Sequence, residues 1–136
     1  MVDANAITWD DIKFFTEAEF VCRATGACDM QMDFVAALDQ MRERLGIPFA
    51  ITSGFRSLQH PIEQKKSAPG PHALGQAADI LLSHEYAFAL LALAPIFPII
   101  TGIGLKQHGP VEERFIHLDC CEATAYRPRP HVWSYE

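Results

Sequence analysis

The architecture of this chain is set by the stretch Pro71-His72-Ala73-Leu74-Gly75-Gln76-Ala77-Ala78-Asp79-Ile80. A glycine-containing turn leads from the histidine into residues 76–82, which alternate too little between polar and apolar types for a solvent-facing strand, so a buried strand is predicted. Asp79 lies inside this apolar run. Because a buried carboxylate is costly unless it is paired, hydrogen-bonded or bound to a metal, Asp79 requires a partner.

A second stretch, Phe115-Ile116-His117-Leu118-Asp119, places a histidine in a strand predicted over residues 114–120. Together His72, Asp79 and His117 form a two-histidine, one-carboxylate set, which is the ligand chemistry of a catalytic zinc with one position open for water. Alone, either histidine would more often be an ordinary loop or strand residue. The four cysteines lack the spacing of a zinc knuckle, so one zinc ion is expected.

Helices and further strands are predicted around these two strands. Apolar residues recur at three- and four-residue steps before Gly46, which stands where a helix C-cap glycine would. The predicted helices cover residues 16–21, opened by a capping box, 32–45 and 83–95, and the other predicted strands cover residues 48–53 and 101–105. Their irregular order favours one α+β domain over residues 1–136, with a small antiparallel sheet and flanking helices.

Composition and charge exclude several classes of protein. The formal net charge is −6 and the basic residues are dispersed, so nucleic acid is not an expected partner. The longest apolar run, residues 86–100, is short for a bilayer and contains two prolines, so no membrane span is expected. Residues 1–6 have neither the basic leader nor the apolar core of a secretory signal, so synthesis in the cytoplasm is expected.

Candidate substrate-binding groups lie outside the metal-ligand set. Arg56 follows the predicted strand 48–53, at a position where functional side chains are commonly displayed, and its guanidinium could clamp a carboxylate. A loop-bracing arginine is the alternative. The C-terminal segment 127–136 is predicted to be a tail that packs on the site, and His131 and Trp133 within it are candidate substrate contacts.

Four motifs, in this order, resemble those of the zinc D-alanyl-D-alanine carboxypeptidases and the related L-alanyl-D-glutamate endopeptidases. They are Ser53-Gly54-Phe55-Arg56-Ser57, His72-Ala73-Leu74-Gly75-Gln76-Ala77-Ala78-Asp79, Gly102-Ile103-Gly104-Leu105 and Phe115-Ile116-His117-Leu118-Asp119. The resemblance extends over most of the chain, since the lead-in from Phe14 to Gly46 is similar to that of small phage and bacterial members. The ordered combination is specific, whereas the His-to-Asp motif alone is only suggestive.

The resemblance implies a function for the predicted site. It implies that His72, Asp79 and His117 hold zinc and that the substrate is the stem peptide of peptidoglycan. It also implies that Arg56 helps to bind a substrate carboxylate or carbonyl, and that the α+β fold is the one shared with the hedgehog signalling domain. Cleavage of D-Ala-D-Ala and cleavage of L-Ala-D-Glu both stay open. Such an enzyme, for example a phage endolysin, would act as a monomer at the cell wall or in the periplasm.

Two departures from the family pattern affect the catalytic base. Gly70 stands where relatives often have serine, and Arg114 stands where many relatives place an acidic general base. Asp119 is the first candidate for the base, because it points to the same face of a strand as the zinc histidine; an orienting partner of a ligand is the alternative. Glu113 is the second candidate, provided that the strand extends that far. A catalytically inactive, zinc-stabilised cell-wall-binding or structural module therefore stays open as a second function.

Overall fold

The structure of the protein is a computed structural model that describes residues 7–136. Residues 1–6, on which the expectation about a secretory signal rests, lie outside the described residues. Within residues 7–136, no helix combines the length and the apolar character needed to cross a bilayer.

Three α-helices occur in the described part of the chain. They are α1 (Met32–Leu45), α2 (Pro61–Gln64) and α3 (His84–Leu93). Gly46 caps α1 in the left-handed conformation (φ 64°), as predicted. The predicted capping box is also present, because the Thr16 N–H donates to the Glu19 carboxylate (2.7 Å), although the helix that follows, Glu17–Phe20, is a 3-10 turn.

Five strands form one sheet in the order β1-β2-β4-β3-β5. They are β1 (Ala50–Ser53), β2 (Ala77–Leu81), β3 (Gly102–Lys106), β4 (Phe115–Asp119) and β5 (His131–Ser134). The first four strands pair antiparallel, whereas β5 runs parallel to β3. The α+β class is therefore confirmed. The predicted tail is in fact an edge strand, which makes the sheet mixed rather than purely antiparallel.

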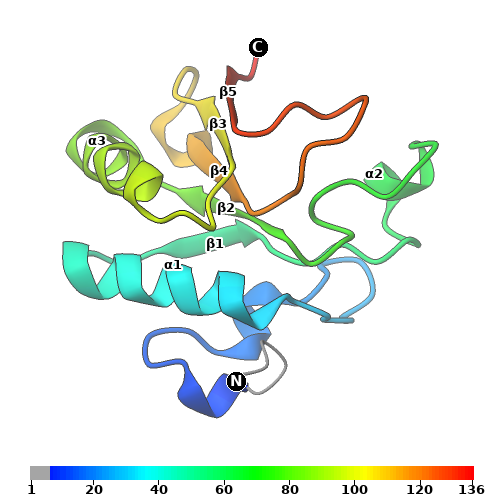
Figure 1. Cartoon of the computed structure of the whole chain (residues 1–136), viewed down its shortest axis with the longest axis horizontal. Coiled ribbons are helices and arrows are strands. Elements are labelled where there is room, and N and C mark those ends of the chain that lie inside the picture. The colour runs from blue at the N-terminus through cyan, green and yellow to red at the C-terminus, as the bar shows by residue number, and fades with distance from the viewer. Residues whose placement is uncertain (1–6) are drawn as a thin grey trace.

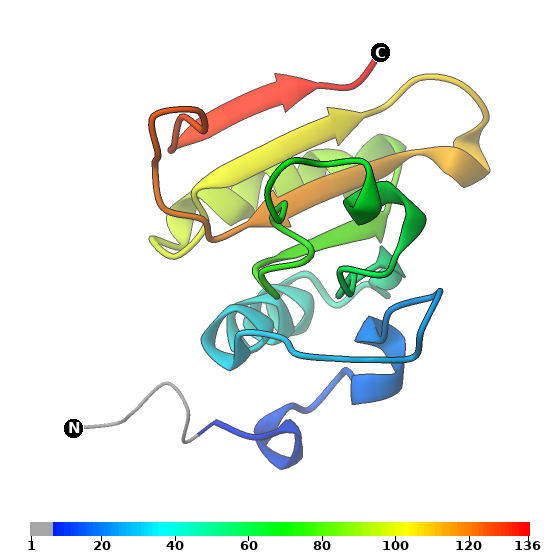
Figure 2. The same cartoon turned by 90° about the vertical axis from the view of Figure 1, so that its right-hand side faces the viewer.

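The two faces of the sheet differ in what covers them. One face packs against α1 and α3, and the core there includes the fully buried Leu38, Leu90, Ile80 and Leu118. Figure 1 shows how the helices and the sheet are arranged, and Figure 2 shows α3 behind the sheet while the loop that contains α2 lies in front of it. Because side chains alternate along a strand, the neighbours of these core residues point to the loop-covered face.

Candidate metal centre

The register of the sheet gathers the predicted site residues in two rows on the loop-covered face. Paired residues of neighbouring strands lie directly opposite one another, so their side chains are adjacent. The first row comprises Asp79, His117, Gly104 and Trp133, and the second comprises Ala77, Asp119, Gly102 and His131. Both β3 positions are glycines. Side chains from the flanking strands therefore have room to fold over β3.

His72 reaches this face from the turn before β2. Gly75, with φ 71°, sits so close to the Asp29 carbonyl that a Cβ atom there would collide with it, so only glycine fits this turn. Its carbonyl accepts the Gln31 N–H (2.8 Å), which ties the turn to the start of α1. The His72 ring is fixed by Nδ1, which lies 2.8 Å from the Gly54 carbonyl and therefore donates to it. Its Nε2 consequently faces Asp79.

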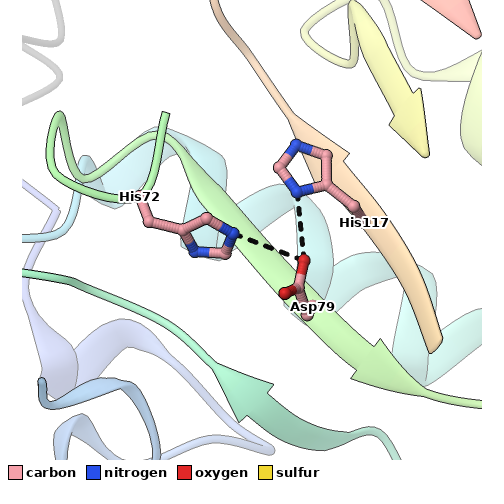
Figure 3. Close-up of side chains that lie close together, drawn as sticks. All are labelled: His72, Asp79 and His117. Atoms are coloured by element: carbon pink, nitrogen blue, oxygen red, sulfur yellow. Dashed lines mark hydrogen bonds and ion pairs between the residues drawn. The ribbon is translucent and has the colours of Figure 1, made fainter. Parts of the chain in front are cut away.

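The two histidines and the aspartate converge on one point (Figure 3). Asp79 Oδ1 lies 3.3 Å from His72 Nε2 and 3.0 Å from His117 Nδ1. One ligand atom from each residue falls within 4.8 Å of the others, and the side chains are buried, with exposed fractions of 4%, 7% and 3% for the three residues in chain order. Two imidazole nitrogens and a carboxylate oxygen in this arrangement can hold a divalent metal ion, which fits the predicted ligand set.

Asp119 contacts the far side of the His117 ring. Its Oδ2 lies 2.7 Å from His117 Nε2, so the Nε2–H can donate to Asp119 while Nδ1 faces Asp79. Arg129 binds the same carboxylate with two hydrogen bonds, from Nε to Oδ1 (2.9 Å) and from Nη2 to Oδ2 (2.8 Å). The Asp119 side chain is fully buried, and its carboxylate lies where a side chain at Gly102 would be. Both carboxylate oxygens therefore have protein partners.

Charge interactions shift the protonation of this cluster. Burial alone would lower the pKa of His117, but its hydrogen bonds with Asp119 and Asp79 and their charges raise it above the ordinary value of 6.5. Burial likewise opposes ionisation of the two carboxyl groups, yet their contacts with histidine, and with Arg129 at Asp119, hold the pKa of Asp79 and of Asp119 well below the usual range. Without a metal, these contacts therefore favour the protonated form of His117 between the two carboxylates.

This charge arrangement predicts a pH dependence for the chelator-treated protein. A raised folded-state pKa stabilises the fold below the unfolded pKa of 6.5, and that contribution is lost as the pH rises through the folded-state value. Between pH 6.5 and pH 9 this loss should lower the melting temperature of the metal-free protein relative to that of His117→Gln, which lacks the group, as measured by thermal unfolding. Parallel profiles of melting temperature against pH for the two proteins would contradict the prediction. Because the pKa values of Asp79 and Asp119 are lowered, their contribution to stability changes only at acidic pH and stays constant between pH 6.5 and pH 9.

Arg56 borders the metal centre as part of an ion-pair chain. Its Nη2 lies 4.0 Å from Asp79 Oδ2, and its Nη1 lies 3.7 Å from Glu63 Oε2. The Glu63 side chain is fully buried and also accepts from Lys66 Nζ (2.8 Å). Sequence reasoning missed Glu63, because it occurs in a polar segment predicted to be a loop and no local pattern marks it as buried.

The C-terminal strand lines the other side of His117 with aromatic rings. The Trp133 ring centre lies 5.2 Å from that of His117, and the exposed His131 ring stacks on Trp133 at 5.6 Å. The Arg129 guanidinium lies over the Trp133 ring at 5.0 Å. A Cβ atom at Gly104 would come within 2.7 Å of Trp133, so glycine allows this ring to approach the sheet. The predicted substrate contacts His131 and Trp133 are therefore on the site face.

The two positions considered for an alternative base lie apart from this cluster. β4 begins at Phe115, so Glu113 is not in the strand; it is an exposed residue at the end of the 3-10 turn Val111–Glu113. Arg114 donates from Nε to the Gly109 carbonyl (2.9 Å). It also lines a hollow with α3 residues such as Phe88 and Leu91, on the helix-covered face of the sheet. The condition that strand β4 extends to Glu113 is therefore not met.

Comparison with known protein families gives one match. A family model described as Peptidase M15 matches residues 13–119, which include all three candidate metal ligands. A search of curated proteins found no match. Proteins of this family are metal-dependent peptidases, typically with zinc, and the buried group of two histidines and an aspartate fits that chemistry. The match covers well over half of the chain, and the chain belongs to the peptidase M15 family.

Proposed function

We propose that the protein is a zinc-dependent hydrolase of a peptide bond in peptidoglycan stem peptides, acting as a D-Ala-D-Ala carboxypeptidase or a related endopeptidase. The observation that carries the proposal is the convergence of His72 Nε2, Asp79 Oδ1 and His117 Nδ1 in a chain of the peptidase M15 family. Three protein ligands with one further position are the arrangement of catalytic zinc sites. No nucleic acid or membrane is needed, and the protein would work as a monomer.

The ligand residues are held in position before any metal binds. When bound, zinc supplies a Lewis acid that polarises a carbonyl and lowers the pKa of water toward ~7. The His72 and His117 rings are oriented because one nitrogen of each faces the Gly54 carbonyl or the Asp119 carboxylate, which leaves the other nitrogen facing Asp79; a bound metal would take the place of the proton on His117 Nδ1. Such outer partners fix the tautomer and the orientation of the ring. The chain therefore supplies a preorganised ligand set rather than three independent side chains.

Asp119 is better suited to orient the His117 ring than to act as a general base. Its two oxygens are engaged by Arg129, His117 and the Cys121 N–H, and the side chain has no exposed surface. A general base needs to reach the proton that it removes, and an oxygen already held by a guanidinium is poorly suited to that task. The contacts of Asp119 thus support the orienting role over the base role first predicted for it.

The remaining site-face residues suit substrate binding. Neither carboxylate contact of Arg56 is short enough for a hydrogen bond, so its N–H donors can bind a substrate carbonyl or carboxylate next to Asp79. Trp133 and His131 form an aromatic wall beside His117, where a peptide can lie against the stacked rings. These residues would hold the scissile bond next to the ligand set.

A zinc-stabilised cell-wall-binding or structural module is the second candidate function. The observation that favours it is the lack of an obvious catalytic base among the described residues: Asp119 is buried and paired, Glu113 is exposed outside β4, and Arg114 stands where many relatives have the base.

Under either function the protein would be made in the cytoplasm and would act at the cell wall or in the periplasm, as a phage endolysin would after membrane damage.

Chelation separates the two functions. We expect purified protein with one equivalent of zinc to release new free amino groups from peptidoglycan, and a chelator to abolish this release because the ligand set holds the ion that polarises the carbonyl. Mass analysis of the products would identify the bond. Restoring zinc after dialysis should restore release. Binding to peptidoglycan without any release, with and without zinc, would reject the enzyme and support the module.

A further inference from the structure

Glu63 is a buried carboxylate held between two cations. It accepts from the Gly70 N–H (3.0 Å) and from Lys66 Nζ (2.8 Å), and Arg56 lies 3.7 Å away. Burial opposes its ionisation, but the hydrogen bonds from Lys66 and Gly70 together with the charges of Lys66 and Arg56 hold the pKa of Glu63 below its ordinary value. Glu63 is thus shared by two cations, one of which, Arg56, also contacts Asp79, whereas Glu63 is the only carboxylate among the described ion pairs of Lys66.

Lys66 lies on the same loop as the metal ligand His72. Its ammonium group lies directly against Gly70, in the space that a side chain at this position would enter. Gly70 is two residues before His72, which places the ammonium beside the metal-binding turn. About a third of the Lys66 side chain is exposed (36%), and its short contact with Glu63 leaves further N–H donors for a ligand.

We propose that Lys66, oriented by Glu63, binds a free α-carboxylate on the substrate residue that directly follows the scissile bond. This inference rests on the proposed function. Arg56 and Lys66 both contact Glu63 Oε2, but only Arg56 also contacts the metal ligand Asp79. Arg56 is therefore suited to the scissile carbonyl, and Lys66, the next cation away from Asp79 in this chain of contacts, is suited to a group one residue further along. The lysine ammonium is a compact point charge on a flexible side chain, so it can bind a carboxylate that approaches from solvent.

Both candidate bonds of the stem peptide offer this carboxylate. After a D-Ala-D-Ala bond, the terminal D-alanine has a free α-carboxylate. After an L-Ala-D-Glu bond, the glutamate continues the chain through its γ-carboxyl group, so that its α-carboxylate is also free. The same cation can therefore serve either specificity, and a peptide with that carboxylate amidated should be a poor substrate in both cases.

Four synthetic peptides test the proposal: one for each bond, each with the α-carboxylate free or amidated. For the zinc-loaded protein we expect kcat/KM to be about tenfold higher on the free acid, the order of one charge-assisted hydrogen bond. Lys66→Gln should remove this preference, chiefly by raising KM, and should leave the amides within about twofold. Lys66→Arg should keep the preference. The matched control is Lys65→Gln, because Lys65 is the exposed neighbouring lysine at the end of α2.

Calorimetric titration of the same peptides keeps the inference separate from the proposed function. If no peptide is cleaved, the proposed function fails, and the acid preference is still measured as a ratio of Kd values. Equal Kd values of the unmodified protein for the acid and the amide peptides would overturn the role of Lys66. So would an equal loss of affinity for acid and amide in Lys66→Gln, since that result would mean that Lys66 only braces the loop. Thermal melting of each variant shows whether the loop has remained folded.

Discussion

Replacing His117 by alanine is expected to abolish stoichiometric zinc binding and, with it, peptide hydrolysis. The substitution removes one of the three ligand atoms that converge at Asp79. Loss of an outer-shell partner of a metal ligand typically lowers metal affinity by about 10–100-fold, and loss of the ligand itself should exceed that. Zinc content after dialysis, measured by atomic absorption, checks the first effect, and release of amino groups from stem peptides checks the second.

The same variant should also be less stable. His117 lies between the carboxylates of Asp79 and Asp119, so its removal leaves two buried acids with one partner fewer each. Removing one partner of a buried pair typically costs about 3–5 kcal/mol, which thermal melting would detect easily. His131→Ala is the matched control: it lies on the same sheet face but is exposed, and it should keep its zinc. A His117→Ala protein with one bound zinc and full activity would reject the site.

Local signals in the sequence predicted the elements that hold the metal ligands. The apolar stripe and Gly46 define α1, because helix periodicity and capping depend on residues only a few positions apart. The metal-ligand set could be predicted because His72 and Asp79 belong to one turn and strand, and because His117 lies in a second predicted strand, which is β4 in the structure. The register of these two strands, with Asp79 opposite His117, then brings the third ligand into place.

Features that depend on distant parts of the chain could not be predicted in this way. β5 pairs in parallel with β3 only because residues 120–130 lead the chain back along the sheet, and a short strand of mixed polarity has no periodic pattern. The burial of Glu63 depends on how its loop folds over the sheet, and the Arg129–Asp119 pair depends on the same return of the chain. Lys66 is only three residues from Glu63, but nothing in this polar segment indicates that the pair is buried beside Arg56, and Arg129 lies ten residues from Asp119.

The Arg129–Asp119 pair gives the second large effect. If Asp119 orients His117, Asp119→Asn should lower zinc affinity by about 10–100-fold, while activity returns at saturating zinc, because the amide oxygen can still accept from His117 Nε2. If Asp119 instead removes a proton, zinc affinity should be unchanged, and kcat should fall by about 10²–10⁴-fold whatever the zinc concentration. Zinc titration followed by kinetics at saturating zinc therefore separates the orienting role from the base role.

Arg129→Met provides the independent arm of this test, because it alters the partner of Asp119 without touching either the carboxylate or the histidine. The Arg129 side chain is largely buried and donates two charged hydrogen bonds to Asp119. Its loss should lower zinc affinity, as expected for Asp119→Asn, and should also lower the melting temperature.

Arg127→Met is the matched control. Arg127 lies in the same segment, and its side chain makes one long hydrogen bond, to the Pro69 carbonyl (3.4 Å), so zinc affinity should not change. If Arg129→Met bound zinc as tightly as Arg127→Met, Asp119 would orient His117 without help from Arg129, and the guanidinium would serve only to neutralise a buried charge.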